Sequence, residues 1–399
     1  MKYIVVLGDG MADYPIEAIG GKTPLEYANT PMMDEMARYS EIGLLHTIPE
    51  GMDPGSDTAN LSVIGYDPEK YYSGRSPLEA LSIGVDMKST DISFRCNLVT
   101  LSEAESSYEK KMILDHSAGE ISNEEAKVLI DAVKKEMQNN TYQFYIGTSY
   151  RHLLIWSQGK QLSLTPPHDI LGKQMGEYLP KDSIFNEMMK KSYDILSNHP
   201  INLARKKAGL NPANSIWFWG AGTKPSLPSF QEKTGKKGAM ISAVDLLKGI
   251  AVGIGIDNIH VTGANGGLNT NYEGKATAAV NALTKEGYDF VYLHVEAPDE
   301  MGHQGEMKKK IQAIEYLDAK VIQNIKEGLD QAGVDYRMLI LPDHFTPISL
   351  RTHVGDPVPY MLYDSVVQKE SDLLYNELCA KKSGMEIKKG YQMIDHLLK

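Results

Sequence analysis

Three short apolar runs in this chain each end in residue types that bind metal ions, and this pattern constrains the fold more than any other. The runs cover residues 3–7, 290–295 and 338–341 and resemble strands that are buried on both faces of a parallel sheet. The side chains that follow them are Asp9, then Asp299 and His303, then Asp343 and His344. Because ligand sites in open α/β sheets lie beyond the carboxyl ends of the strands, we expect these side chains to meet at one edge of one sheet.

Both ends of the chain alternate between strand and helix patterns. Thr30 and Pro31 form a helix start, and a strand at 42–47 follows. Pro359 favours an edge position for the last strand. After the middle of the chain we expect helices at 243–252, 275–283 and 308–332, and strands at 258–262, 289–295, 337–341 and 358–363. This alternation predicts an α/β domain with a mostly parallel sheet.

The middle of the chain has a different pattern. Residues 91–99 alternate between apolar and polar, as a half-exposed antiparallel strand does. Further strands are expected at 111–115, 142–146 and 150–156, with an amphipathic helix at 124–137. A proline-rich stretch near residue 225 is typical of a linker. We therefore predict a large α/β domain made of residues 1–87 and 226–399, interrupted by a smaller α+β domain at 88–225.

Composition excludes several classes of partner. The chain has 399 residues, a formal net charge of −11 and two cysteines, Cys96 and Cys379. The negative charge argues against a nucleic-acid or anionic-membrane partner, and two distant cysteines imply no disulfide framework. The N-terminus lacks the layout of a signal peptide, and no stretch approaches the ~20 apolar residues of a membrane span. We expect a soluble, cytoplasmic protein.

The strand-end residues have the side chains and the positions needed to bind two metal ions. A serine and one more histidine complete the set. Mixed carboxylate and imidazole ligands suit manganese or zinc, and magnesium less well. Two ions about 3.5–4 Å apart would clamp the attacking and leaving oxygens of a phosphoryl transfer. The alternative is coincidence, since some of the 11 histidines will lie near acids by chance. The candidate ligands are Asp9, Ser56, Asp299, His303, Asp343, His344 and His353.

Ser56 is the candidate nucleophile. Gly55 permits a sharp turn before it, and the residues that follow have helical composition. Ser56 is therefore expected at a helix N-terminus, where free N–H groups and the helix dipole favour an anion. Two interpretations stay open: a plain N-cap, which is the commoner use of serine there, or a hydroxyl activated by metal coordination.

Cations for an anionic substrate are expected mainly in the inserted domain, because arginine pairs with carboxylate and phosphate in a way that lysine cannot. Lys275, near a helix start, could reach a phosphate in the main site, although it also fits a solvated helix residue. The adjacent pairs Arg151-His152 and His168-Asp169 also fit the ordinary polarity of surface loops. The candidates in the inserted domain are Arg151, His152, His168, Asp169 and Arg205.

Several motifs, spread over almost the whole chain, resemble those of the archaeal-type, cofactor-independent phosphoglycerate mutases. That family belongs to the alkaline phosphatase superfamily of metalloenzymes, so the resemblance implies a three-layer αβα fold. The motifs are Gly8-Asp9-Gly10-Met11, Gly55-Ser56-Asp57-Thr58-Ala59-Asn60, Gly74-Arg75-Ser76-Pro77-Leu78-Glu79-Ala80, Asn271-Tyr272-Glu273-Gly274-Lys275-Ala276, Ala297-Pro298-Asp299-Glu300-Met301-Gly302-His303 and Pro342-Asp343-His344.

The resemblance also implies roles. One metal ion would be surrounded by Asp9, Ser56, Asp343 and His344, and the other by Asp299, His303 and His353. Ser56 would be phosphorylated during the conversion of 3-phosphoglycerate to 2-phosphoglycerate. Manganese is the expected metal, with zinc, cobalt or magnesium as alternatives, and no bisphosphoglycerate is required.

Three alternatives to a mutase stay open. Departures from the expected family pattern at His116 and over 263–270 bear on the identity of the small phosphorylated substrate. A homoserine kinase-like phosphotransferase and a metal-dependent phosphatase would both keep the same ligands and nucleophile. A non-catalytic, metal-binding sensor protein would have no need of Ser56.

Overall fold

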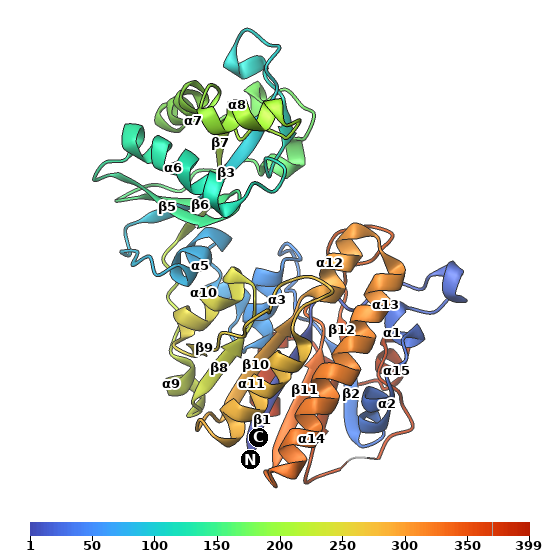
Figure 1. Ribbon diagram of the computed structural model, residues 1–399. Coiled ribbons are helices and arrows are strands. Elements are labelled where there is room, and N and C mark those ends of the chain that lie inside the picture. Colours follow the sequence, from blue (N-terminus) through green and yellow to red (C-terminus); the bar gives the residue numbers. More distant parts are fainter. Residues whose placement is uncertain (369) are drawn as a thin grey trace. The chain divides into compact units, whose positions relative to one another are not determined.

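The computed structural model describes residues 1–368 and 370–399 and divides into two compact units (Figure 1). The large unit consists of Met1–Tyr72 and Ser226–Lys399, and the inserted unit of Ser73–Pro225. The inserted unit therefore begins 15 residues before the boundary expected at residue 88. The reason is that α5 (Arg75–Ser82) packs on strands of the inserted unit, where Ala80 joins a buried cluster with Leu153 and Ile155.

The large unit is built on an eight-stranded sheet with the order β13-β2-β12-β11-β1-β10-β8-β9. Neighbouring strands are parallel except around β12, which is antiparallel to both β11 and β2. This confirms the mostly parallel sheet. The strands are β1 (Lys2–Gly8), β2 (Ser40–Leu45), β8 (Gly238–Ile241), β9 (Asp257–Asn258), β10 (Phe290–Val295), β11 (Tyr336–Leu341), β12 (Val358–Asp364) and β13 (Glu386–Ile387).

Helices cover both faces of this sheet, which confirms the three-layer αβα fold. On one face α11 (Tyr272–Thr284), a π-helical segment (Leu317–Ile322) and α14 (Gln323–Gln331) bury a core with Ile4 and Val6 of β1 (Figure 1). On the other lie α3 (Ser56–Val63), α10 (Asp245–Ile254) and α16 (Met393–Leu397). The remaining helices are α1 (Pro24–Tyr27), α2 (Pro31–Ala37), α4 (Pro68–Tyr71), α9 (Phe230–Thr234), α12 (Ala297–Gln304), α13 (Met307–Tyr316) and α15 (Glu377–Lys382).

The structure corrects three predictions in the large unit. The strand of Pro359 lies inside the sheet, between β2 and β11. Proline is tolerated there because pairing with β11 begins only at Met361, so no hydrogen bond from the nitrogen of Pro359 to β11 is needed. The strand expected at 258–262 is reduced to β9, since its neighbour β8 ends at Ile241. The helix expected at 308–332 is interrupted by the π-helical segment, where the Asp318 carboxylate accepts hydrogen bonds from the first turn of α2.

The inserted unit is an α+β unit around β3 (Ile92–Leu101), which pairs with three other strands. Its core gathers aromatic rings around Phe185, whose centroid is 4.7 Å from that of Phe94 and 5.0 Å from that of Phe218. The other elements are β4 (Ile113–Asp115), α6 (Asn123–Met137), β5 (Tyr142–Thr148), β6 (Arg151–Trp156), α7 (Ser183–Leu196), α8 (Pro200–Lys207) and β7 (Ser215–Thr223).

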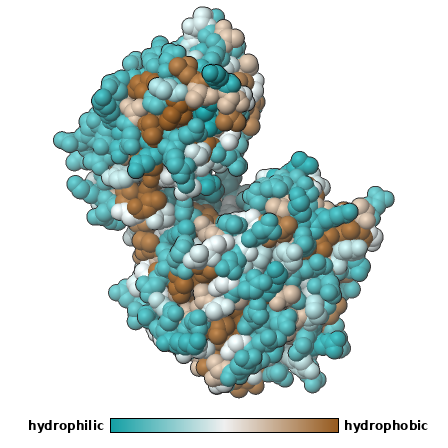
Figure 2. All heavy atoms as spheres, in the orientation of Figure 1, coloured by the Kyte–Doolittle hydropathy of each residue, from teal (hydrophilic) through white to brown (hydrophobic). Residues whose placement is uncertain are grey.

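The visible surface of each unit is mostly hydrophilic, with small apolar patches scattered over it (Figure 2). Within the described residues, no helix combines the length and the apolar composition that crossing a membrane would require.

Candidate metal centre

The three strands that carry the predicted ligands are neighbours: β1 lies between β10 and β11. The backbone N–H of Asp9, just after β1, donates to the carbonyl of Val295 at the end of β10, at 2.9 Å. On the other side the N–H of Gly10 donates to Oδ1 of Asp343 at 3.1 Å. The segment after β1 is therefore hydrogen-bonded to the end of β10 and to the Asp343 side chain after β11, at one edge of the sheet.

Gly10 is required at this edge. Its φ of +57° is unfavourable for other residues. A Cβ there would lie 2.4 Å from Oγ1 of Thr346 and 2.5 Å from Oδ1 of Asp299. The absence of a side chain lets the segment after β1 approach the Asp299 carboxylate.

Ser56 is the first residue of α3, and its N-cap is Gly55. The interpretation of Ser56 as a plain N-cap is therefore wrong. Its Oγ lies 3.0 Å from Nε2 of His344 instead. Asn60, one turn further along α3, donates to the carbonyl of Ser56 and to Oδ2 of Asp343, both at 2.8 Å. The start of α3 is thus bonded directly to the ligand cluster.

The first group of candidate ligands is buried and consists of Asp9, His294 and Asp343, whose ligand atoms lie within 4.8 Å of one another. Oδ2 of Asp9 is 2.9 Å from Nε2 of His294. Oδ1 of Asp9 is 3.5 Å from Nε2 of His344, and it has no hydrogen-bond partner within the described part of the chain. A buried carboxylate oxygen without a partner is costly unless a cation reaches it.

The second group consists of Asp299, His344 and His353. Oδ1 of Asp299 lies 3.4 Å from Nε2 of His353, and its Oδ2 lies 3.3 Å from Nε2 of His303. The two imidazole atoms, Nε2 of His303 and Nε2 of His353, are only 2.8 Å apart. The rings of His344 and His353 stack with their centroids 3.8 Å apart. Nε2 of His344 also lies 3.3 Å from Asp343, so this ring adjoins both groups.

Fixed acceptors set the tautomers of three of these histidines. Nδ1 of His303 lies 3.0 Å from the carbonyl of Arg351, and Nδ1 of His353 lies 3.0 Å from that of Pro54. A carbonyl only accepts, so each neutral ring carries its proton on Nδ1. Thr346 Oγ1 donates to Asp299 and so accepts from Nδ1 of His344 at 3.2 Å. In their neutral forms, all three rings therefore aim an Nε2 lone pair into the cluster, as histidines bound to metal ions do.

The pKa values of the acids and histidines in the cluster also indicate that it attracts positive charge. Burial, and then the charges of Asp343 and Asp299, raise the pKa of Asp9 well above its usual range. Burial also pushes the pKa of Asp299 upward, but hydrogen bonds from His303 and His353 outweigh it and hold that pKa well below its usual range. The hydrogen bond to Asp299 raises the pKa of His303 to about 9. The residues fit divalent metal ions, because a metal ion would replace the proton that the cluster otherwise attracts.

Comparison with known proteins identifies the family. The model of 2,3-bisphosphoglycerate-independent phosphoglycerate mutase matches residues 37–202. A protein of that name from Methanosarcina barkeri is 49% identical over 405 aligned positions, which cover 100% of both chains. The chain belongs to this family.

Two solved structures resemble the whole chain, and one of them is named as a phosphoglycerate mutase. A Pyrococcus horikoshii protein of known structure is 33% identical, with a TM-score of 0.81, over 100% of this chain and 96% of its own. A cofactor-independent phosphoglycerate mutase from Thermoplasma acidophilum is 27% identical, with a TM-score of 0.65, over 100% of this chain and 99% of its own.

Sequence reasoning missed two residues that the structure places in the candidate site. His294 lies inside an apolar strand and resembled a core residue, although it is the last residue but one of β10 and so close to the ligand edge. Asn60 had a usable signal, because its spacing of four from Ser56 places both on one face of a helix. Tyr292 fixes Asn60 in turn, by donating to its Oδ1 at 2.6 Å.

The side chains predicted to bind substrate lie in different environments. Arg205 is buried and donates to Glu125 and to the carbonyls of Asn211 and Ala118, so it supports the local backbone. His152 is buried as well, and burial lowers its pKa to about 3. Lys275 is not a solvated helix residue: it is fully buried, and its Nζ donates to the carbonyl of His294 at 2.8 Å.

His168 and Arg151 belong to a cluster of rings and cations in the inserted unit. The ring of His168 lies 5.2 Å from that of Trp219, and the Arg95 guanidinium lies 4.3 Å from the Trp219 ring. His116 contacts both His168 and Tyr150, over which Arg151 sits at 5.3 Å. We call Arg95, His116, Tyr150, Arg151, His168 and Trp219 the ring cluster. The exposed Asp169 lies beside it, 3.7 Å from His168.

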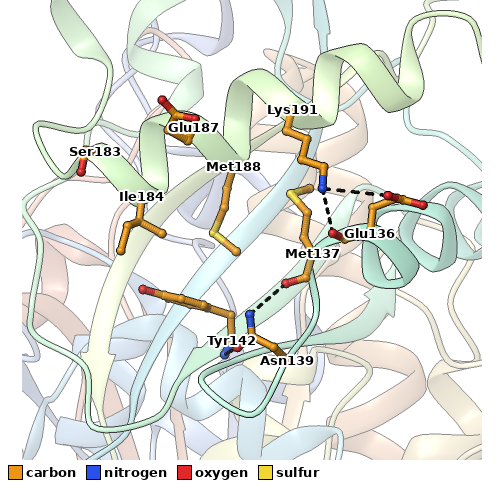
Figure 3. A pocket seen from close by; sticks show the side chains of 9 residues that line it. All are labelled: Glu136, Met137, Asn139, Tyr142, Ser183, Ile184, Glu187, Met188 and Lys191. Atoms are coloured by element: carbon orange, nitrogen blue, oxygen red, sulfur yellow. Dashed lines mark hydrogen bonds and ion pairs between the residues drawn. The ribbon is translucent and has the colours of Figure 1, made fainter.

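One hollow in the inserted unit contains none of the predicted site residues. It has a volume of about 520 Å³, and Figure 3 shows Met137 of α6 and Met188 of α7 beside it. Lys191 closes one side by donating to the carbonyl of Glu136 at 2.9 Å. Its lining offers no group of metal ligands and no unpaired cation for a phosphate.

His294 is expected to contribute to metal binding. His294→Ala should weaken Mn²⁺ binding by at least about tenfold, because outer partners alone are worth 10–100-fold in metal affinity. Equilibrium dialysis of purified, metal-stripped protein measures this. His260→Ala, at an exposed histidine of the same unit, is the control and should leave binding unchanged. Equal Mn²⁺ affinity of the His294 variant and the native protein would exclude a role for this ring.

Metal binding should also release a proton from His303. Its pKa of about 9 means that the metal-free ring is protonated at pH 7, and Nε2 must lose the proton before it binds a metal ion. Mn²⁺ affinity should therefore rise with pH up to about 9 and level off above it. Calorimetry in buffers of different ionisation heat should find about one proton released at pH 7.5. His303→Asn should lower that release, and an undiminished release in this variant would contradict the assignment.

Proposed function

We propose that this protein interconverts 3-phosphoglycerate and 2-phosphoglycerate through a phosphoserine at Ser56, without 2,3-bisphosphoglycerate. One observation carries the proposal: Oγ of Ser56 lies 3.0 Å from Nε2 of His344, beside the carboxylates of Asp9 and Asp343. A hydroxyl in this position serves no capping role in α3 and is available as a nucleophile. The names of full-length relatives favour the mutase over the kinase alternative.

Two divalent ions would be held by this cluster, and manganese suits the mixture of carboxylate and imidazole best, with zinc, cobalt or magnesium as alternatives. Bound ions would lower the pKa of the serine hydroxyl and neutralise charge on the transferring phosphoryl group. The proposed ligands are Asp9, Ser56, Asp343 and His344 for one ion, with His294 added, and Asp299, His303 and His353 for the other.

The chain's own groups then perform a transfer in two halves. Oγ of Ser56 attacks the phosphorus of 3-phosphoglycerate, the bond from phosphorus to the 3-oxygen breaks, and the serine proton ends on that oxygen. The N-terminus of α3 presents backbone N–H groups to the phosphoryl oxygens. Glycerate turns within the site, and its 2-oxygen takes the phosphoryl group back, which returns the proton to Ser56. Asn60 holds the start of α3 in register with Asp343 throughout.

The inserted unit is proposed to retain glycerate between the two halves, since its escape would leave a phosphatase. The ring cluster supports this role, because guanidinium groups bind carboxylates in a bidentate fashion and rings beside them exclude water. Arg151 and His168 are proposed to contact the substrate, with Asp169 orienting His168. Arg205 and His152 are proposed to support that surface, and Lys275 to support His294.

Replacement of the nucleophile tests the covalent route. Ser56→Ala should lower turnover of 3-phosphoglycerate, assayed without bisphosphoglycerate, by at least about 10⁴-fold, as loss of a nucleophile does elsewhere. Most of the Mn²⁺ should still bind, because the carboxylates and imidazoles remain. Ser62→Ala, on the same helix, is the matched control. Mass spectrometry of the native protein quenched during turnover should find phosphate on Ser56, and substantial mutase activity in Ser56→Ala would refute the route.

Arg151 tests the role of the inserted unit. Arg151→Met should raise KM for 3-phosphoglycerate by about 10–100-fold, since a hydrogen bond to a charged group is worth ~1.5–3 kcal/mol. Release of free phosphate should rise relative to mutase turnover, because glycerate would escape more often. Lys160→Met removes another exposed cation of the same unit, one paired with Asp182 at 3.0 Å, and should change neither quantity. Identical KM and phosphate release in the two variants would remove Arg151 from the substrate site.

A further inference from the structure

Lys310 is a fully buried lysine that lies behind the metal centre and has no part in the proposed transfer. It belongs to α13, the helix that follows the ligand-bearing α12. Its Nζ has three acceptors: Oδ2 of Asp13 at 2.8 Å, the carbonyl of Thr346 at 2.8 Å and the carbonyl of Ala12 at 3.2 Å. An ammonium has three protons to donate, so each one is used.

These acceptors lie on the segments that carry the ligands. Ala12 and Asp13 follow Asp9 after β1, and Thr346 follows Asp343 and His344 after β11. The same two segments also meet directly, where the N–H of Thr346 donates to the carbonyl of Ala12 at 3.2 Å. One ammonium therefore links α13 to both strand-end segments.

Thr346 carries this link to the ligands themselves. While its carbonyl accepts from Lys310, its Oγ1 donates to Oδ1 of Asp299 at 2.5 Å and lies 3.2 Å from Nδ1 of His344. The position of Oγ1 thus fixes the carboxylate of Asp299 and the tautomer of His344. A shift of the Thr346 backbone would move two proposed ligands at once.

Asp13 is held as firmly as Lys310. Its Oδ2 also accepts the N–H of Ile348 at 3.1 Å, and its Oδ1 accepts the N–H of Tyr14 at 2.7 Å. Its own N–H donates to Oε1 of Glu377 at 3.0 Å. The carboxylate therefore neutralises the buried ammonium and ties the segment after Thr346 back to the segment after β1.

We propose that Lys310 is a positioning residue of the metal centre, which holds Thr346 so that Asp299 and His344 present their ligand atoms to the metal ions. This inference rests on the proposed metal site. The buried ion pair of Lys310 and Asp13 would keep ligand atoms from separate segments within a few tenths of an ångström of the positions that metal binding requires.

A neutral double variant tests the proposal with the least damage to folding. Lys310→Gln together with Asp13→Asn removes both charges and can keep one hydrogen bond between the two side chains. The glutamine amide has only two N–H groups where the ammonium has three, so it cannot keep the bonds to both Ala12 and Thr346. Mn²⁺ affinity, measured by equilibrium dialysis on metal-stripped full-length protein, should fall by about 10–100-fold, as it does when outer partners of ligands are lost. Native protein should bind two ions.

Asp318→Asn is the matched control. Asp318 is also a fully buried charged residue in the same run of helices, but within the described part of the chain its carboxylate accepts only from the N–H groups of Met32 and Met33 in α2. This variant should lower the melting temperature of the metal-free protein as the double variant does, while its Mn²⁺ affinity stays within about twofold of native. A purely structural role for Lys310 predicts the same result for both variants, and native affinity in the folded double variant would overturn the proposal.

Thr346→Val tests the same link if the double variant does not fold. Valine has nearly the shape of threonine and keeps the carbonyl that Lys310 binds, but it removes Oγ1 from Asp299 and His344. One of the two Mn²⁺ ions should then bind at least about tenfold more weakly. Unchanged binding of both would overturn the proposal, because Lys310 would have no route to the ligands. Native protein that binds fewer than two ions would instead contradict the metal site itself.

Discussion

Three carboxylates, those of Asp9, Asp299 and Asp343, converge at one edge of the large unit's sheet, and the rest of the site depends on this concentration of negative charge. Burial, and then the like charges of Asp343 and Asp299, raise the pKa of Asp9. The surrounding histidines do not relieve the repulsion while they are neutral, because their protons are turned outward toward Arg351, Pro54 and Thr346. Only protons or metal ions can complete such a cluster.

The arrangement follows from the order of the strands more than from any single residue. Because β1 is flanked in parallel by β10 and β11, the segments after all three strands leave the sheet on the same side. Gly10 then lets the segment after β1 approach Asp299, and Lys310 is hydrogen-bonded to the segments after β1 and β11. The ligands come from positions almost 350 residues apart in the chain, yet their backbones are neighbours.

The sequence predicted this edge well because its signals are local: an apolar run, then an acid or an imidazole. The six ligand candidates other than Ser56 come together with it in one cluster. His294 escaped prediction because the pleat of β10 decides which way it points, and an apolar run does not encode that. The edge position predicted for the strand of Pro359 is wrong. Proline prefers edge strands because it has no backbone N–H to donate, but the pairing with β11 begins at Met361 and needs no N–H from Pro359. The ring cluster could not be predicted, since His116, Tyr150, His168 and Trp219 lie on separate segments that only the sheet around β3 brings together.

Charge finally explains how an acidic protein can act on an acidic substrate. The chain has a net charge of −11, which repels a phosphorylated carboxylic acid at long range. Two divalent ions bound among three carboxylates, as proposed, would however give the metal centre a net positive charge, and neutral histidines would not alter that balance. The ring cluster of the inserted unit contains two guanidinium groups: Arg151, which is exposed, and Arg95, which pairs with Glu79 at 3.0 Å and stays charged although burial lowers its pKa to about 10. Each unit thus has its own source of local positive charge: the metal ions proposed for the large unit, and arginine in the inserted unit. This division explains why the nucleophile belongs to the unit that holds the acids.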